Sequence, residues 1–463
     1  MGTYVPNTIK EQQEMLRSIG VESMKELFHT IPKEVLLDRP LQLNQGMSEL
    51  SVKRRMTHIA AKNKVFTSIF RGAGAYNHYI PSIVKQITSK EEFVTAYTPY
   101  QAEISQGVLQ SIFEYQTMIC ELTGMDVSNA SVYDGATAAA EAVIMCKERK
   151  KNKAIISEAV HPQTIETIKT YCSGTDIEVI LAPTKDGLTD IDQLRKLIDA
   201  ETACVLLQQP NFYGLLEDGE GIGKLVSEAK AMFIVSCNPI SLGILNAPIE
   251  YGADIAVGEG QPLGIPLSFG GPYLGFMATT KEYLRRLPGR IVGETKDSRG
   301  ERAYVLTLQA REQHIRREKA SSNICSNQAL CAMTAAVYMD AMGKKGLTQA
   351  AELSMSKAHY LADRLCEIDG IELVYRGNYF NEFVTTCKGS VDKLLSELEK
   401  CGILGGYPLG RNVVRENQVT ENQFTGTPLT EDEYPYILWC ATEMNTKEEI
   451  DTLVNIVKEV ASL

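Results

Sequence analysis

The feature that most constrains the fold is a series of short apolar strands separated by helical stretches in the middle of the chain. The strands are expected at residues 154–157, 178–182, 203–208, 232–236, 254–257 and 274–279. Helical periodicity separates them, for example over residues 189–200, whose apolar side chains fall on one face. Because near-continuous apolar strands are buried on both faces, the pattern predicts an α/β domain with a mostly parallel central sheet. Ligands of such a sheet bind at the carboxyl ends of its strands.

The composition is that of a globular protein with two or three domains. The chain has 463 residues, of which 44% are hydrophobic and 23% charged. Its net charge of −11 argues against nucleic acid or an anionic membrane as a main partner. No apolar run approaches the roughly 20 residues that a membrane helix needs, and the first residues hold no apolar signal core.

Cysteine and histidine are scattered along the chain. The 11 cysteines include no CxxC pair, and the six histidines form no HxxxH cluster. This pattern predicts reduced thiols, a cytoplasmic location and no metal site.

Three regions are expected. Residues 1–65 are predicted to form an N-terminal helical arm that packs on a neighbouring subunit or domain, with a basic amphipathic helix at 48–62. Residues 66–325 hold the apolar strands and are predicted to form a large α/β domain. Residues 326–463 are predicted to form a small α/β domain, which follows a helix at 327–342. Its further elements are expected as strands at 371–375, 382–387 and 436–441, a helix at 391–400, and a last helix capped by Thr446 and Glu449.

Residues 254–280 are predicted to form a strand, a Gly/Pro-rich loop and a second strand. In many enzymes that use pyridoxal phosphate (PLP), such a segment carries the lysine that forms the Schiff base. Here no lysine or arginine occurs between Lys230 and Lys281. The sequence therefore predicts the scaffold of a PLP site without its reactive amine.

A polar run precedes a long helix expected at residues 101–123. Its candidate side chains for ligand or interface contacts are Tyr97, Tyr100, Gln101, Glu103, Ser105 and Gln106. Composition alone leaves open whether they bind a ligand or only pack. The earlier glycine-rich stretch, residues 70–84, is interpreted as a loop.

A second helix start lies at residues 135–137, where Gly135, Ala136 and Thr137 open an Ala-rich helix. Such a start can cradle a phosphate. A plain N-cap made by Asp134 explains the same residues, and both interpretations stay open here.

Basic residues are concentrated in residues 311–319. They are Arg311, His314, Arg316, Arg317 and Lys319. Charge runs are usually solvated helix faces. The alternative is a site that binds carboxylates or the acidic surface of a partner.

Four stretches resemble the glycine decarboxylase P-protein of the glycine cleavage system, within the aspartate-aminotransferase-like (fold type I) PLP enzymes. They are YTPYQAEISQG at residues 97–107, NASVYDGATAAAEA at 129–142, GEGQPLGIPLSFGGP at 258–272 and AREQHIRREKASSNIC at 310–325. The stretches are long and follow the family's order. They resemble the N-terminal half of the fused P-protein, so a chain of this length is similar to subunit 1 of the two-subunit form.

The resemblance also implies where the cofactor is held. The family's PLP lysine belongs to the other half, in a His-Lys pair at the place where this sequence has Gln261 and Pro262. The strand that normally supplies an aspartate to the cofactor ring here ends Ser236-Cys237-Asn238. No catalytic residue and no covalently bound PLP are therefore expected on this chain.

A complex is implied as well. Subunit 2 would bind PLP, and two copies of each subunit would form a heterotetramer. The complex would decarboxylate glycine and pass the aminomethyl group to the lipoyl arm of the H-protein. This chain would supply one wall of the site, with the polar run at residues 97–106 as first candidates and Arg311, His314 and Arg316 as second candidates.

Two rival interpretations of the sequence stay open. An independent PLP enzyme would need another lysine, such as Lys224 or Lys230, but both lie on a helix ahead of a strand, away from the strand's carboxyl end. The other rival is a non-catalytic scaffold that only stabilises the PLP-bearing partner.

Overall fold

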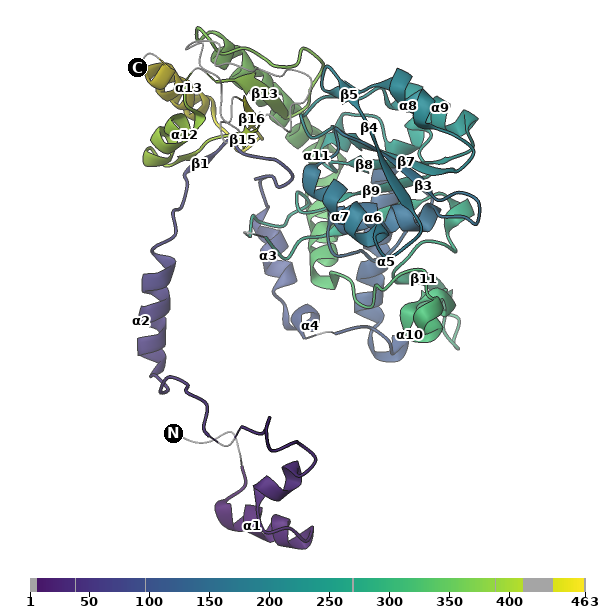
Figure 1. Cartoon of the computed structure of the whole chain (residues 1–463), viewed down its shortest axis with the longest axis vertical. Helices are drawn as coiled ribbons and strands as arrows, with labels where there is room; N and C mark the ends of the chain where they lie inside the picture. Colours follow the sequence, from purple (N-terminus) through teal and green to yellow (C-terminus); the bar gives the residue numbers. More distant parts are fainter. Residues whose placement is uncertain are drawn as a thin grey trace. The chain divides into compact units, whose positions relative to one another are not determined.

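A computed structural model describes residues 6–37, 39–95, 97–268, 270–387, 389–410 and 436–461 of the chain (Figure 1). It divides into two units, residues 1–64 and 65–463. The first unit holds α1 (Ile9–Ser18), a 3-10 helix (Met24–Phe28) and α2 (Glu49–Ala60), and none of these helices buries a residue. Its described residues form short helices and no strand.

The second unit is built on a seven-stranded sheet with the order β2-β10-β9-β8-β7-β3-β4. Its strands are β2 (Val127–Ser128), β3 (Lys153–Ser157), β4 (Glu178–Ala182), β7 (Thr202–Gln209), β8 (Met232–Cys237), β9 (Ile255–Glu259) and β10 (Gly275–Thr279). Neighbours from β9 to β4 pair in parallel, while β10 runs antiparallel to both β9 and β2. The mostly parallel sheet is confirmed.

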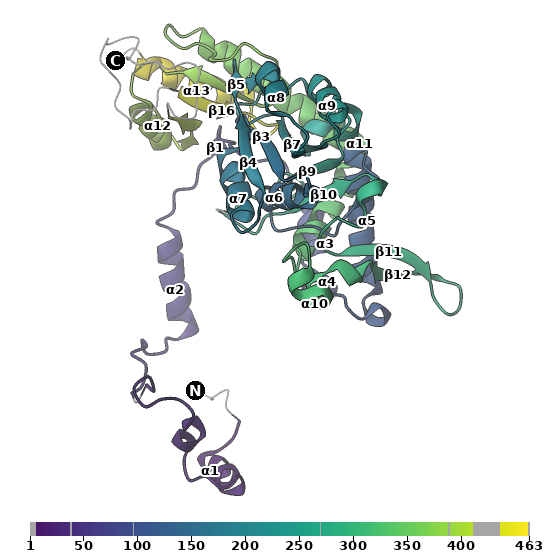
Figure 2. The ribbon, with the colours of Figure 1, turned by 45° about the vertical axis from the view of Figure 1, so that its right-hand side comes forward.

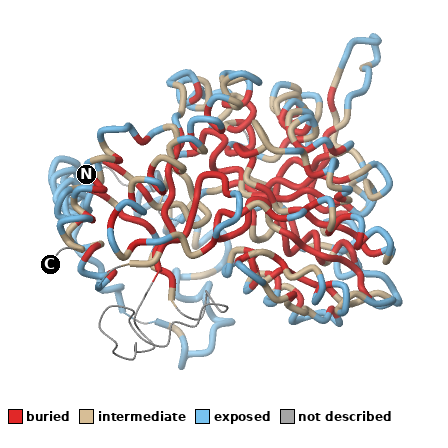
Figure 3. The backbone as a smooth tube through the Cα atoms, turned by 90° about the horizontal axis from the view of Figure 1, so that it is seen from above, coloured by how far each residue is buried: buried red, intermediate tan, exposed pale blue. Residues whose placement is uncertain are grey.

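Both faces of this sheet are covered, because alternate residues of each strand enter different cores. In β7, Val205 and Leu207 belong to one core, whereas Cys204 and Leu206 belong to the other. The first core is completed by α5 (Gln106–Thr123), α8 (Ile191–Leu197), α9 (Gly219–Glu228) and part of α11 (Ala329–Cys366). The second is completed by α6 (Gly135–Cys146) and α7 (Pro162–Cys172), which lie side by side in Figure 1. Figure 3 shows the buried residues gathered along the middle of this unit.

Several helix bounds differ from expectation. The helix expected from residue 101 begins at Gln106, since a 3-10 turn (Ala102–Ile104) precedes it. The helix expected at 327–342 continues to Cys366 with a kink at Gly343, whose positive φ of 59° suits a residue without a side chain. None of the helices within the described ranges is long and apolar enough to span a bilayer.

A β-hairpin in the basic region was missed by the sequence analysis. It consists of β11 (Ile291–Lys296) and β12 (Arg302–Thr307), paired antiparallel along their whole length. Figure 2 shows it extending away from the central sheet. Its outer residues are exposed and charged, so they give no apolar strand signal.

The C-terminal region has its own three-stranded sheet, with the order β13-β16-β15. Its elements are β13 (Glu382–Thr386), α12 (Val391–Lys400), β14 (Ile403–Leu404), β15 (Tyr407–Leu409), β16 (Tyr436–Cys440) and α13 (Lys447–Ala461). The strand expected at 371–375 is wrong: only Leu373 forms a bridge, to Thr385, and the surrounding backbone is irregular. Because α11 packs in both this core and the central one, the predicted division at residue 325 stays a prediction.

Smaller elements complete the second unit. They are β1 (Ser68–Ile69), which pairs with β14, α3 (Ser82–Thr88), α4 (Glu91–Val94), β5 (Thr184–Lys185), β6 (Leu188–Thr189) and α10 (Gln313–Arg316).

Candidate functional site

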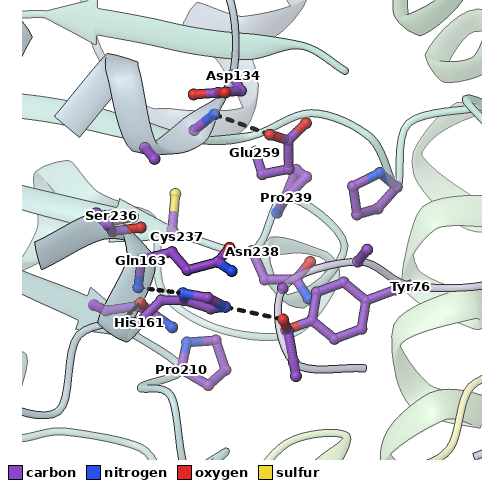
Figure 4. A pocket seen from close by; sticks show the side chains of 18 of the residues that line it. Tyr76, Asp134, His161, Gln163, Pro210, Ser236, Cys237, Asn238, Pro239 and Glu259 are labelled. Carbon is purple, nitrogen blue, oxygen red and sulfur yellow. Dashed lines mark hydrogen bonds between the residues drawn. The ribbon is translucent and has the colours of Figure 1, made fainter. Parts of the chain in front are cut away.

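A cavity of about 260 Å³ lies at the carboxyl ends of the parallel strands (Figure 4). Residues that follow or end β7, β8 and β9 line it, together with the N-terminal ends of α6 and α7 and the loop at residues 73–76. This is the edge where an open α/β sheet binds its ligands.

Glu259 closes the side of the cavity next to α6. Its carboxylate accepts hydrogen bonds from the backbone amides of Gly135 (2.9 Å), Gln261 (2.9 Å) and Leu274 (3.0 Å). A Cβ atom at Gly135 would lie 2.7 Å from the backbone nitrogen of Glu259, so the approach needs glycine. Burial raises the pKa of Glu259 to about 7.

Asp134 is the N-cap of α6, and its carboxylate accepts from the backbone amide of Thr137 at 2.8 Å. The N-cap interpretation of this helix start therefore holds. The first amide of the helix, that of Gly135, is taken by the carboxylate of Glu259.

On the opposite side of the cavity, Glu382 from β13 holds the loop at residues 73–76. Its carboxylate accepts from the backbone amide of Ala73 (2.6 Å) and from the hydroxyl of Tyr76 (2.7 Å). Burial raises the pKa of Glu382 to about 7. His161 donates from Nε2 to the carbonyl of Ala73 (2.9 Å) and accepts at Nδ1 from the amide of Gln163 (3.1 Å), which fits a neutral imidazole. Burial also lowers the pKa of His161.

Gln261 stands where the resemblance places the family's histidine. Its side chain accepts from the amide of Tyr76 (2.8 Å) and donates to the carbonyls of Tyr76 (2.9 Å) and Ile265 (2.7 Å). The glycine-rich stretch interpreted as a loop is thus part of the cavity wall. Its only sequence signal was glycine beside an aromatic residue.

The charges of the cavity do not fit PLP. Its described lining residues include Asp134, Glu259 and Glu382 but no lysine or arginine. PLP carries an anionic phosphate, which would meet the Glu259 carboxylate at the N-terminus of α6, and it needs an amine for its aldehyde. Lys230 lines a different cavity, at the amino end of β8, and Lys224 lies within α9.

The polar run ahead of α5 is mostly solvent-exposed. Tyr97 is 84% exposed, and Gln101 and Glu103 are also exposed. Ser105 is the N-cap of α5 without a side-chain cap bond. Gln106 instead points inward. Its side-chain amide nitrogen donates to the backbone carbonyl of Tyr304 (2.9 Å), and its side-chain oxygen accepts from the backbone amide of Tyr304 (2.8 Å). Gln106 therefore attaches α5 to β12.

Three of the predicted residues, Tyr100, Arg311 and His314, lie near Arg290, which the sequence did not point to. The guanidinium donates to the hydroxyl of Tyr100 (3.1 Å) and lies 5.3 Å from the centre of its ring. The ring of His314 is 6.3 Å from that of Tyr100, edge-on. Arg311 donates to the carbonyl of Gly289 (2.7 Å), next to Arg290. The side-chain oxygen of Asn327 accepts from the guanidinium of Arg290 at 3.4 Å. We name Tyr100, Arg290, Arg311, His314 and Asn327 the Arg290 cluster.

Arg316 does not join this cluster. It is exposed and its Nε donates to the carbonyl of Ala310 at 3.4 Å. The signal that could have found Arg290 is an arginine directly ahead of the apolar pair Ile291-Val292.

The comparisons with known proteins decide the family. The model of the "Glycine cleavage system P-protein" matches residues 2–423. This chain belongs to the P-protein family. Similar P-protein relatives include proteins named "Probable glycine dehydrogenase (decarboxylating) subunit 1" from Carboxydothermus hydrogenoformans (50% identical over 456 residues, 98% of each chain) and Desulfitobacterium hafniense (47% over 455 residues, 97% of this chain and 98% of the relative).

Solved structures give the same answer. A crystal structure of glycine decarboxylase (P-protein) of the glycine cleavage system, in inhibitor-bound form, is 39% identical, covers 99% of this chain and 100% of its own, and has a TM-score of 0.89. A sphingosine-1-phosphate lyase from Burkholderia pseudomallei shares the fold alone, at 12% identity, 92% and 93% coverage and a TM-score of 0.64. The resemblance seen in the four P-protein motifs and the fold type I architecture are confirmed.

Proposed function

We propose that this chain is subunit 1 of a two-subunit glycine dehydrogenase (decarboxylating). With subunit 2 it decarboxylates glycine and passes the aminomethyl group to the lipoyl group of the H-protein. Relatives of about 50% identity over nearly the whole chain carry the subunit 1 name, which supports the pairing with a second subunit.

The observation that supports PLP binding by subunit 2, and not by this chain, is the position of the Glu259 carboxylate at the N-terminus of α6. This carboxylate accepts the hydrogen bond from the backbone amide of Gly135, the amide that a cofactor phosphate would otherwise bind. PLP, when bound, supplies the electron sink that stabilises the carbanion left by decarboxylation. Since the described residues that line this cavity include neither lysine nor arginine, we assign PLP and its lysine to subunit 2.

This chain supplies one wall of an active site at the interface. Tyr97, Gln101 and Glu103 project from the polar run ahead of α5 with their side chains exposed, ready to contact another chain. Arg311, His314 and Arg316 lie in the neighbouring basic region. The assembly is a heterotetramer of two copies of each subunit in the cytoplasm, with the lipoylated H-protein as its second partner.

The test is glycine–bicarbonate exchange by the chain co-purified with subunit 2, measured for the single variants Tyr97→Phe, Gln101→Ala and Glu103→Gln. Exposed Glu228→Gln on α9 is the matched control for charge removal. We expect at least one variant to lower the exchange rate about tenfold or more, the effect of losing about 1.4 kcal/mol of transition-state stabilisation. Full rates for all three variants, in complexes that assemble normally, would favour the scaffold alternative.

A further inference from the structure

Arg290 is a buried cation whose partners are all neutral. The residue is 4% exposed. Its guanidinium donates to the hydroxyl of Tyr100 at 3.1 Å and to Oδ1 of Asn327 at 3.4 Å, and its Nε is buried without a partner. No carboxylate within the described ranges forms an ion pair with it.

A second guanidinium, that of Arg311, bonds to the residue next to Arg290 in the chain. Arg311 binds the carbonyl of Gly289, and its Nε is also buried without a partner. The acid beside Arg311 is Glu312, whose carboxylate charge acts on the Arg311 guanidinium. Its Oε2 lies 3.6 Å from Nδ1 of His314, and its Oε1 has no hydrogen-bond partner. Arg290 is therefore a buried guanidinium for which no acid among the described residues supplies a counter-charge.

A buried charge is costly unless an opposite charge accompanies it, and guanidinium groups are the side chains best shaped to bind a carboxylate through two hydrogen bonds. Tyr100 fits the same ligand. Its hydroxyl oxygen already accepts from Arg290, which leaves the hydroxyl proton for donation, and Tyr100 is 55% exposed to solvent.

From these contacts we infer that the Arg290 cluster is a carboxylate-binding site whose anion comes from outside this chain. Arg290 provides the charge, and Tyr100 provides a second donor. The inference rests on the proposed function only for the source of the carboxylate, which is either the amino acid substrate or an acidic side chain of subunit 2.

The first experiment uses the complete chain by itself. Sodium acetate is titrated into wild type, Arg290→Lys and Arg290→Gln, with sodium chloride at equal ionic strength as the salt control, and the melting temperature is recorded. The control variant is Arg299→Gln, whose side chain is 75% exposed and pairs with Asp297 and Glu301 on the hairpin turn. We expect acetate to stabilise wild type and Arg299→Gln, and both Arg290 variants to bind it about tenfold more weakly or worse.

A second readout separates binding from a structural role. If Arg290 is an unpaired charge, Arg290→Gln without acetate melts no lower than wild type. If Arg290 only holds Tyr100 and Asn327 in place, Arg290→Gln melts at a lower temperature than wild type, and acetate shifts the melting temperature of the two proteins equally. Should Arg290→Gln fail to fold, Tyr100→Phe tests the site by removing one donor, with an expected loss of acetate affinity of about threefold to tenfold. Equal acetate binding by wild type and variants overturns the inference.

The second experiment identifies the source in the complex with subunit 2. A raised KM for glycine in Arg290→Gln, with an unchanged Kd between subunits, assigns the carboxylate to the substrate. A raised Kd with an unchanged KM assigns it to subunit 2. No change in either quantity overturns the inference. Because acetate binding is measured without turnover, a failed activity assay leaves the first experiment intact.

Discussion

The backbone amide of Gly135 donates to the carboxylate of Glu259 over 2.9 Å, joining the first turn of α6 to the end of β9. A glycine was required for this contact, because a Cβ would lie 2.7 Å from the backbone nitrogen and 2.9 Å from the Cα of Glu259. A protein carboxylate thus stands at the helix N-terminus, where the positive end of the helix dipole attracts anions.

Gly135→Ala is expected to destabilise the chain by about 1–3 kcal/mol, because the added methyl group meets backbone instead of a flexible side chain. The control is Gly107→Ala in α5, where a Cβ has nothing within 4 Å. There the better helix propensity of alanine is expected to leave stability unchanged or raise it by up to about 1 kcal/mol. Urea unfolding of both variants checks the contrast, and equal effects would contradict the close approach.

Glu259 and Glu382 are expected to make the chain less stable as pH rises. Burial raises both pKa values in the folded chain from 4.5 to about 7. The folded state therefore holds more protons than the unfolded state between these values. Their contribution to stability is fully present below pH 4.5 and is lost as pH rises through about 7, with a slope of at most about 1.4 kcal/mol per pH unit for each group.

The measurement is the free energy of unfolding against pH for wild type, Glu259→Gln and Glu382→Gln. Each variant should flatten the curve between about pH 5 and pH 8. Exposed Glu228→Gln should not change its shape. A wild-type stability that increases across this window by the same amount in all four proteins would contradict the prediction.

Much of the architecture was predictable, because a buried parallel strand must be apolar on both faces, and β3, β7 and β8 are mostly buried and apolar. The exposed hairpin β11–β12 was missed, since its outer residues are mostly exposed and charged and give no apolar strand signal. The irregular segment around Leu373 was mistaken for a strand because it is apolar yet pairs through a single bridge.

The site was harder to predict than the fold. The missing lysine is visible in the sequence, whereas the contact between Gly135 and Glu259 joins residues 124 positions apart. The same holds for Tyr100 and Arg290, 190 positions apart. Only the order of strands in the sheet and the placement of the hairpin bring such pairs together.

We expect Gln106 to stabilise the fold of this chain and not to contact another chain. Gln106→Ala removes both hydrogen bonds to the backbone of Tyr304 and leaves that backbone without its partner, so we expect a loss of about 1–3 kcal/mol. Gln110→Ala, one turn later, loses only a bond to Glu114 on the same helix and should cost less than about 0.5 kcal/mol. If Gln106→Ala kept wild-type stability and instead reduced exchange activity, Gln106 would belong to the interface.

The most direct measurement of the division of labour is borohydride reduction in the presence of PLP, followed by peptide mapping. It is applied to the complete chain alone and to its complex with subunit 2. We predict that the reduced cofactor is recovered on a single lysine peptide of subunit 2 and on no peptide of this chain, in either sample. A stoichiometric PLP-lysine adduct on this chain alone, at Lys224, Lys230 or elsewhere, would contradict the account.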